Sequence, residues 1–221
     1  MGNDNGRAAD SIGINAGLAI PDRAFGTTHW RVERWDEEQT SWAIRLLEIE
    51  AGAPINRSRK TSVDVLPSAF RRVGIEPYEV SELVGNLITN AGWTRLMNLL
   101  TAQGATQALT ATSVRIGVGN SNTTETYTDT DLGAAAGAAN RYFQPVSGAG
   151  SLGTRTLAFS ATFGTADGNF AWNEFGLDVG TPTVAGGTTV GALLFNHKAG
   201  IAQGTKASGQ TWTATATISF T

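Results

Sequence analysis

The last eleven residues of the chain alternate without a break between apolar and hydroxylated side chains. The even positions hold Trp212, Ala214, Ala216, Ile218 and Phe220, while Thr or Ser occupies every odd position from 211 to 221. A period of two residues places alternate side chains on opposite faces of a β-strand. This segment therefore predicts a strand with one face in a core and the other wet or lightly covered.

Other segments share this period of two. The apolar positions are Val114, Ile116 and Val118 in one segment and Leu157, Phe159, Ala161 and Phe163 in another. NFAWNEFGLDVG and VGALLFNHKAG supply two more strands, and the 27 Gly residues suit frequent turns. Five or more strands without helices between them predict a mainly β fold, with an antiparallel β-sandwich or jelly-roll-like body.

A short helix is predicted at about residues 36–50. Asp36 can cap its first turn, and Gln39 completes a capping box. Its large apolar residues share one face: Trp42, Leu46 and Ile49. That face must pack either on the body of the same chain or on a neighbouring subunit.

Charge divides the chain into two regions. Residues 1–80 hold 22 of the 35 charged residues, and a shift of this kind marks a boundary between differently built regions. We predict an extended N-terminal arm with one short helix over 1–80 and a sandwich body over 81–221, preceded by a second helix at about 90–103. Residues 1–28 lack periodicity, so we expect them to be disordered in the free protein and ordered in an assembly.

Composition excludes several kinds of site. There is no Cys, and the only histidines are His29 and His197, which rules out thiolate chemistry and a multi-histidine metal site within one chain. The net charge of −3 provides no positive field for direct nucleic-acid binding. No apolar run reaches the roughly 18 residues of a membrane span, and the N-terminus lacks the pattern of a secretory signal peptide. We expect no cofactor, no metal, no direct nucleic-acid contact and no membrane insertion.

Glu174 is the most unusual carboxylate because it lies inside an aromatic strand. If buried, it needs a partner, since an unpaired buried charge is costly. The candidate partners are Arg115, Arg141 and Lys198. No second carboxylate is placed to make a glycosidase pair with it.

The remaining polar motifs give no catalytic signature. Gly117 and Gly119 imitate part of a dinucleotide fingerprint, but a strand-ending turn is the simpler interpretation. Asp129 and Asp131 have the spacing of a calcium loop without its other ligands, so the alternatives are a loose calcium site and a helix cap at Asp131. His197 lacks an evident Ser or Asp partner and is interpreted as a sheet-surface or interface histidine. We therefore predict that the chain is not an enzyme.

Large aromatic and basic side chains in the N-terminal region are the candidate partner interface. Trp30, Trp35 and Trp42 lie within 13 residues, which is more aromatic surface than one short helix can hide. Five basic residues follow: Arg57, Arg59, Lys60, Arg71 and Arg72. The alternatives are burial of all three Trp side chains within the chain and a solvated basic loop.

Several blocks of residues 29–221 resemble, in order, a family of tailed-bacteriophage virion proteins. The sequence contains RVERWDEEQTSWAIR, GNLITNAGWTRLMNLLTAQG and NRYF, and the most specific blocks are GVGNS, FAWNEFG and GTKASGQTW. The family resembled is that of the auxiliary capsid proteins, also called decoration or cement proteins. The chain has His197 where the family pattern has Arg.

The resemblance implies a structural protein on the capsid surface of a virion, made in the cytoplasm of a host bacterium. Its expected partner is the major capsid protein, and a homo-oligomer is expected, with a trimer favoured. A tail-fibre, collar or baseplate component is the alternative within this class. A carbohydrate-binding β-sandwich is the alternative from another class.

Overall fold

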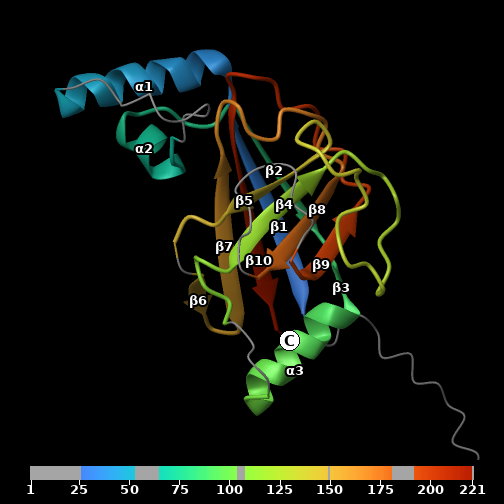
Figure 1. Cartoon of the computed structure of the whole chain (residues 1–221). Helices are drawn as coiled ribbons and strands as arrows, with labels where there is room; N and C mark the ends of the chain where they lie inside the picture. The colour runs from blue at the N-terminus through green and yellow to red at the C-terminus, as the bar shows by residue number, and fades with distance from the viewer. Residues whose placement is uncertain (1–25, 53–64, 104–107, 149, 181–191, 221) are drawn as a thin grey trace, which may run out of the picture.

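The structure, a computed structural model, describes residues 26–52, 65–103, 108–148, 150–180 and 192–220. Within these residues, two antiparallel five-stranded sheets pack face to face and three helices lie outside them (Figure 1). The mainly β antiparallel sandwich predicted from the alternation is confirmed.

Sheet A has the strand order β2-β1-β10-β7-β6. Its strands are β1 (Thr27–Trp35), β2 (Glu79–Val84), β6 (Ser151–Gly153), β7 (Thr156–Phe163) and β10 (Thr211–Ser219). The alternation of the last strand is realised here, since Trp212, Ala214, Ala216 and Ile218 are all buried. Thr215 and Thr217 on the opposite face are only partly covered.

Sheet B has the order β3-β9-β8-β4-β5. Its strands are β3 (Leu87–Ile88), β4 (Val114–Gly119), β5 (Arg141–Pro145), β8 (Glu174–Val179) and β9 (Leu194–Ala199). The β7–β8 and β9–β10 connections both cross between the sheets. They do so at the same end of the sandwich, because Phe163 at the end of β7 pairs with Trp212 at the start of β10.

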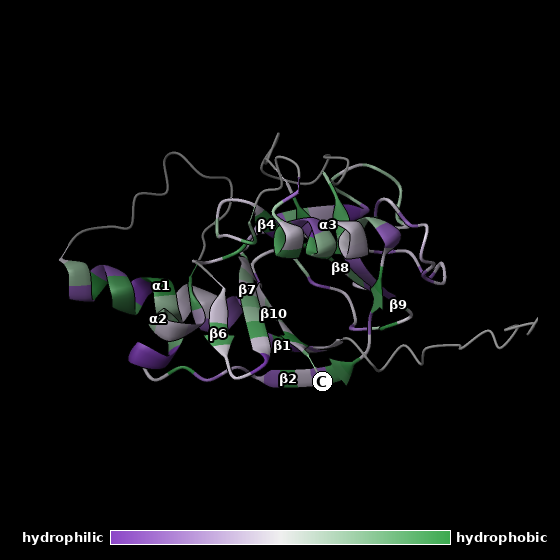
Figure 2. Cartoon of the chain, turned by 90° about the horizontal axis from the view of Figure 1, so that it is seen from below, coloured by the Kyte–Doolittle hydropathy of each residue, from purple (hydrophilic) through white to green (hydrophobic). Residues whose placement is uncertain are grey.

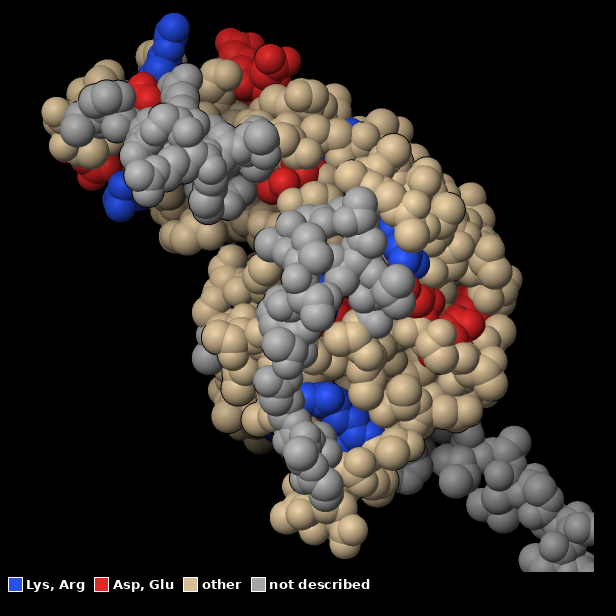
Figure 3. All heavy atoms as spheres, in the orientation of Figure 1, with Lys and Arg blue, Asp and Glu red and all other residues tan. Residues whose placement is uncertain are grey.

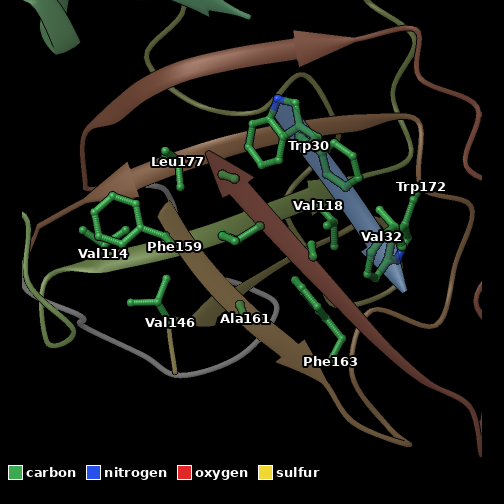
Figure 4. Packing of buried hydrophobic residues seen from close by; sticks show 14 of the residues in the cluster. Trp30, Val32, Val114, Val118, Val146, Phe159, Ala161, Phe163, Trp172 and Leu177 are labelled. Atoms are coloured by element: carbon green, nitrogen blue, oxygen red, sulfur yellow. The ribbon is translucent and has the colours of Figure 1, made fainter. Parts of the chain in front are cut away.

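Aromatic side chains from both sheets fill the space between them (Figure 4). The Trp30 ring of sheet A stacks on the Phe175 ring of sheet B with centroids 4.8 Å apart, and Trp172 meets Trp212 edge-on at 4.9 Å. Burial of such large apolar surfaces is the main favourable contribution to folding.

The boundary expected near residue 80 does not separate an arm from the sandwich. β1 lies inside sheet A between β2 and β10, and pairs with β10 over its whole length. The charges of this region concealed the strand, because Arg31 projects from the outer face while Trp30 and Val32 on the inner face enter the core. β2 likewise begins within the region assigned to the arm and belongs to sheet A.

The helices lie at two ends of the sandwich. α1 (Glu37–Ala51) and α2 (Pro67–Arg72) lie together at one end, and α3 (Asn90–Thr101) lies at the other (Figure 1). Figure 2 shows hydrophobic and hydrophilic residues mixed along α1. Two helices were expected, and α2 is the addition, beginning with Pro67 at its first position.

The helix predicted at about 36–50 begins directly after its predicted cap, Asp36, and the helix predicted at about 90–103 begins at Asn90. The Asp36 carboxylate accepts a 2.8 Å hydrogen bond from the Gln39 backbone N–H, and the Gln39 side chain accepts one from the Asp36 N–H in return. α3 is capped by Thr89, whose hydroxyl accepts from the Gly92 N–H at 3.0 Å. None of the described helices has the length and apolar run that a membrane crossing requires.

Candidate partner-binding surface

Two of the three tryptophans predicted at an interface are buried inside the chain. Trp30 is 1% exposed in the sandwich core, and Trp35 is fully buried outside it, where its ring stacks on Phe70 of α2 at 4.5 Å. Both belong to β1 and not to a helix, so the two faces of one strand direct them into two different cores. Neither side chain is available to a partner in this fold, which corrects the sequence prediction.

A second small core holds the helical end of the molecule together. The buried residues come from β1, α1, α2 and the segment before α2: Trp35, Ala43, Ile44, Val65 and Phe70. This cluster covers the inner face of α1. We call α1, α2 and this cluster the helical module.

The opposite face of α1 is apolar and open. Trp42 is 54% exposed and Ile49 is 75% exposed, while Leu46 between them is half-buried. We call these three residues the outer face of α1. A groove of about 810 Å³ runs beside Trp42 and reaches Ile75, with Glu38 and Arg45 along it. An aromatic ring next to a groove with charged neighbours is typical of an interface anchor.

The basic residues predicted at the interface divide into two groups. Arg57, Arg59 and Lys60 lie outside the described residues. Arg71 and Arg72 are partly exposed on α2, but both are paired: Arg71 contacts Glu33 at 2.5 Å, and Arg72 contacts Glu50 of α1 at 3.0 Å. Figure 3 shows blue and red side chains together at the helical end, beside a largely uncharged sandwich surface. These two arginines help tie α2 to β1 and α1.

A buried charge cluster lies on the outer face of sheet B. His197 is 1% exposed, and its Nε2 is 2.8 Å from Glu174 while its Nδ1 is 2.7 Å from Asp129. Glu174 is fully buried and also accepts backbone N–H bonds from Gly133 and Ala134, each at 2.8 Å. The cluster fastens the connection between β4 and β5 to the sheet.

The two carboxylates determine the charge of His197. An ionised carboxylate cannot donate a hydrogen bond, so both ring nitrogens must carry a proton for both contacts to be favourable. Burial lowers the pKa of His197, but its hydrogen bonds and charge interactions with Glu174 and Asp129 outweigh that effect and raise the pKa. Burial conversely raises the pKa of Asp129, and bonds from Thr126 and His197 lower it overall.

Each candidate partner of Glu174 has another carboxylate. Arg115 pairs with Asp178 at 2.8 Å, Arg141 with Asp131 at 3.0 Å, and Lys198 with Glu125 at 3.0 Å. The interpretation of His197 as a surface or interface residue is wrong. Its link to Glu174 depends on the pairing of Gly176 with His197, and an isolated sequence gives no signal of that register.

The motifs considered for ligands have structural roles. Gly117 and Gly119 both lie within β4, not in a turn after it. A side chain at Gly117 would collide with Phe143, so this glycine allows close packing. Asp131 is not a helix cap, because no helix lies between β4 and β5, and its carboxylate pairs with Arg141. Among the described residues, no group of three or more His, Asp and Glu side chains is arranged to hold a metal ion.

Comparison with protein-family models, curated proteins and solved structures finds no match to this chain. The outer face of α1 is thus identified as the candidate functional surface by its geometry. It carries Trp42, which is the exposed one of the three tryptophans predicted at the interface.

Proposed function

We propose that this chain is a bacteriophage virion structural protein, and specifically a capsid decoration protein. In this proposal it binds the outer surface of the major capsid protein lattice and stabilises the DNA-filled head. The resemblance of its sequence blocks to auxiliary capsid proteins supports the class. The role is non-catalytic, because binding to a lattice requires a stable body and a contact surface and no reacting groups.

The outer face of α1 is the observation that carries the proposal. An apolar stripe of Trp42, Leu46 and Ile49 on a helix at one end of a rigid sandwich is suited to insert into a partner. The opposite face of the same helix is fixed by its own small core, so the stripe is presented on a preorganised element. Many copies on a symmetric lattice would multiply a weak individual contact by avidity.

Binding of purified protein to capsids that lack it tests this surface. Trp42→Ala should weaken co-sedimentation with capsids by about 30-fold or more, which corresponds to the loss of roughly 2 kcal/mol expected at an interface anchor. Tyr127→Ala is the matched control, because Tyr127 is similarly exposed at 51% but lies away from α1 in the β4–β5 connection. Equal binding by the two variants would contradict the assignment of the outer face of α1.

The two alternatives predict different targets. A tail-fibre, collar or baseplate component would bind tails and not capsids. A carbohydrate-binding sandwich would bind to glycans displayed on an array, with its exposed aromatic rings stacking on the sugars. Binding to tails alone or to glycans alone would replace the decoration proposal.

A further inference from the structure

Lys206 is a buried amine in the connection between β9 and β10. The residue is fully buried, and its Nζ donates hydrogen bonds to Gly164 O and Asn169 Oδ1, both at 2.7 Å. Both acceptors belong to the connection between β7 and β8. This lysine has lost its hydration without gaining a direct salt bridge to any of the described residues, which is a costly arrangement for an ammonium group.

The backbone fixes the approach of the two connections. The Lys206 N–H donates to Phe170 O at 3.1 Å, and the Trp172 N–H donates to Gly204 O at 2.9 Å. Ala171 and Thr205 form a β-bridge between these contacts. The chain around Lys206 therefore runs antiparallel to the chain just after Asn169, and the side chains of both residues are held at one place.

The Asn169 carboxamide is oriented toward the amine. Its Nδ2 donates to Thr165 O at 3.1 Å, which leaves Oδ1 facing Lys206. The carboxamide carbon is one C=O bond beyond an oxygen that already touches the amine. Since a C=O bond is about 1.23 Å long, that carbon lies within about 3.9 Å of the amine nitrogen, which is close to the separation of reacting atoms in a near-attack geometry.

Asp167 provides a carboxylate beside this pair. It is 7% exposed, accepts a 2.6 Å bond from the Tyr142 hydroxyl, and accepts the Gly164 N–H at 3.2 Å. Gly164 thus contacts Asp167 through its N–H and Lys206 through its carbonyl. Burial lowers the pKa of Lys206 to about 8, with the charge of Asp167 acting in the opposite direction. With a pKa of about 8, roughly a tenth of the amine is neutral and nucleophilic at pH 7.

We propose that Lys206 and Asn169 become joined by an isopeptide bond that forms within the folded chain. The neutral amine nitrogen of Lys206 attacks the carboxamide carbon of Asn169, so a C–N bond forms and the bond from that carbon to Nδ2 breaks. Asp167 takes a proton from the attacking nitrogen and delivers it to the departing nitrogen, which leaves as ammonia. The products are one secondary amide and one ammonia, and no oxidant, reductant or other reactant is needed.

The bond would close a covalent loop between positions 37 residues apart. It would tie together the two connections that cross between the sheets at one end of the sandwich. A cross-link of this kind stabilises a fold chiefly by restricting the unfolded chain. It would lock the sandwich in a protein that contains no disulfide.

Intact mass spectrometry of the purified folded protein tests the bond directly. The expected mass is lower than the mass of the sequence by one ammonia. Because a succinimide at Asn5-Gly6 would cause the same loss, the site must be located with trypsin, which cleaves after Lys and Arg. A cross-linked chain is not cut after Lys206 and yields peptides 156–198 and 199–221 as a single species. Full mass together with cleavage after Lys206 would overturn the proposal.

Three variants separate chemistry from packing. Asp167→Asn retains both joined side chains and should show the full sequence mass, because the proton carrier is gone. Lys198→Arg, a change at a lysine that pairs with Glu125, should still show the loss of ammonia. Loss of ammonia from Lys206→Arg, located to residue 169, would overturn the proposal, since that variant has no primary amine at the site.

Discussion

Gly119 on β4 lies directly opposite Glu174 on β8, and a Cβ atom at residue 119 would overlap the Glu174 carboxylate. The carboxylate cannot move away easily because Gly133, Ala134 and His197 all bind it. The glycine is therefore required by the buried charge cluster. The dinucleotide-like motif that contains it is explained by packing.

Gly119→Ala should lower the free energy of unfolding by about 1–3 kcal/mol, the usual cost of overpacking a filled site. Gly26→Ala is the control, since a Cβ there meets its neighbours at an ordinary 3.6 Å. Urea denaturation of both variants measures the difference. Equal stability of the two would show that Glu174 is not fixed as described.

Stability should fall as pH rises through the titration of His197. The folded-state pKa of His197 is raised above its usual 6.5, so its contribution is complete below pH 6.5 and is lost as pH rises through the folded pKa. The pKa of Asp129 is lowered below its usual 3.8, so Asp129 contributes stability at any pH above 3.8. That contribution is lost as pH falls through the folded-state pKa of Asp129. Denaturation between pH 5 and about pH 9 should show the decline on the alkaline side.

His197→Gln is the variant that isolates this effect. It retains a polar side chain but cannot become positively charged, so the alkaline decline should flatten and the protein should be less stable at pH 6. Removing one partner of a buried ion cluster costs roughly 3–5 kcal/mol. An unchanged pH profile in His197→Gln would contradict a charged His197 in the fold.

The tryptophans of the N-terminal region should separate into structural and binding residues. Trp35→Ala removes a fully buried ring that stacks on Phe70 and should cost about 3–5 kcal/mol of stability. Trp42→Ala removes an exposed ring and should change stability by less than about 0.5 kcal/mol. Thermal denaturation followed by circular dichroism checks both. A large loss of stability in Trp42→Ala would place that ring in the core of the helical module.

A homotrimer remains our expectation for assembly, and light scattering of the soluble protein measures it. The expected mass is three times 23.1 kDa. Since Trp30 and Trp35 are buried, the trimer cannot depend on them as anchors. A monomer at micromolar concentration would remove the trimer from the proposal and leave lattice binding to be tested separately.

The sequence predicted the features that depend on local patterning. The alternation along β10 and the capping box at Asp36 are local signals, and both appear in the structure where expected. β1 was not predicted because its outward residues are charged and its neighbour β10 lies at the other end of the chain. Only long-range pairing identifies that charged segment as a strand inside sheet A.

The contacts within the polar clusters are set by strand register and by the paths of the connecting loops. An isolated sequence specifies neither, so most of these contacts could not be predicted. Glu174 was correctly identified as needing a partner, but His197 reaches it through the pairing of β8 with β9. Asp129 comes from a loop whose path no periodicity specifies. Lys206 and Asn169 meet for the same reason, since two separate connections run side by side.

Cryo-electron microscopy of virions of the phage proposed to encode the chain tests the central proposal most directly. We predict density for the sandwich at every equivalent position of the capsid surface, with α1 turned toward the major capsid protein and Trp42 at the contact. Density confined to the tail, a capsid contact made without α1, or absence of the chain from the particle would each contradict it.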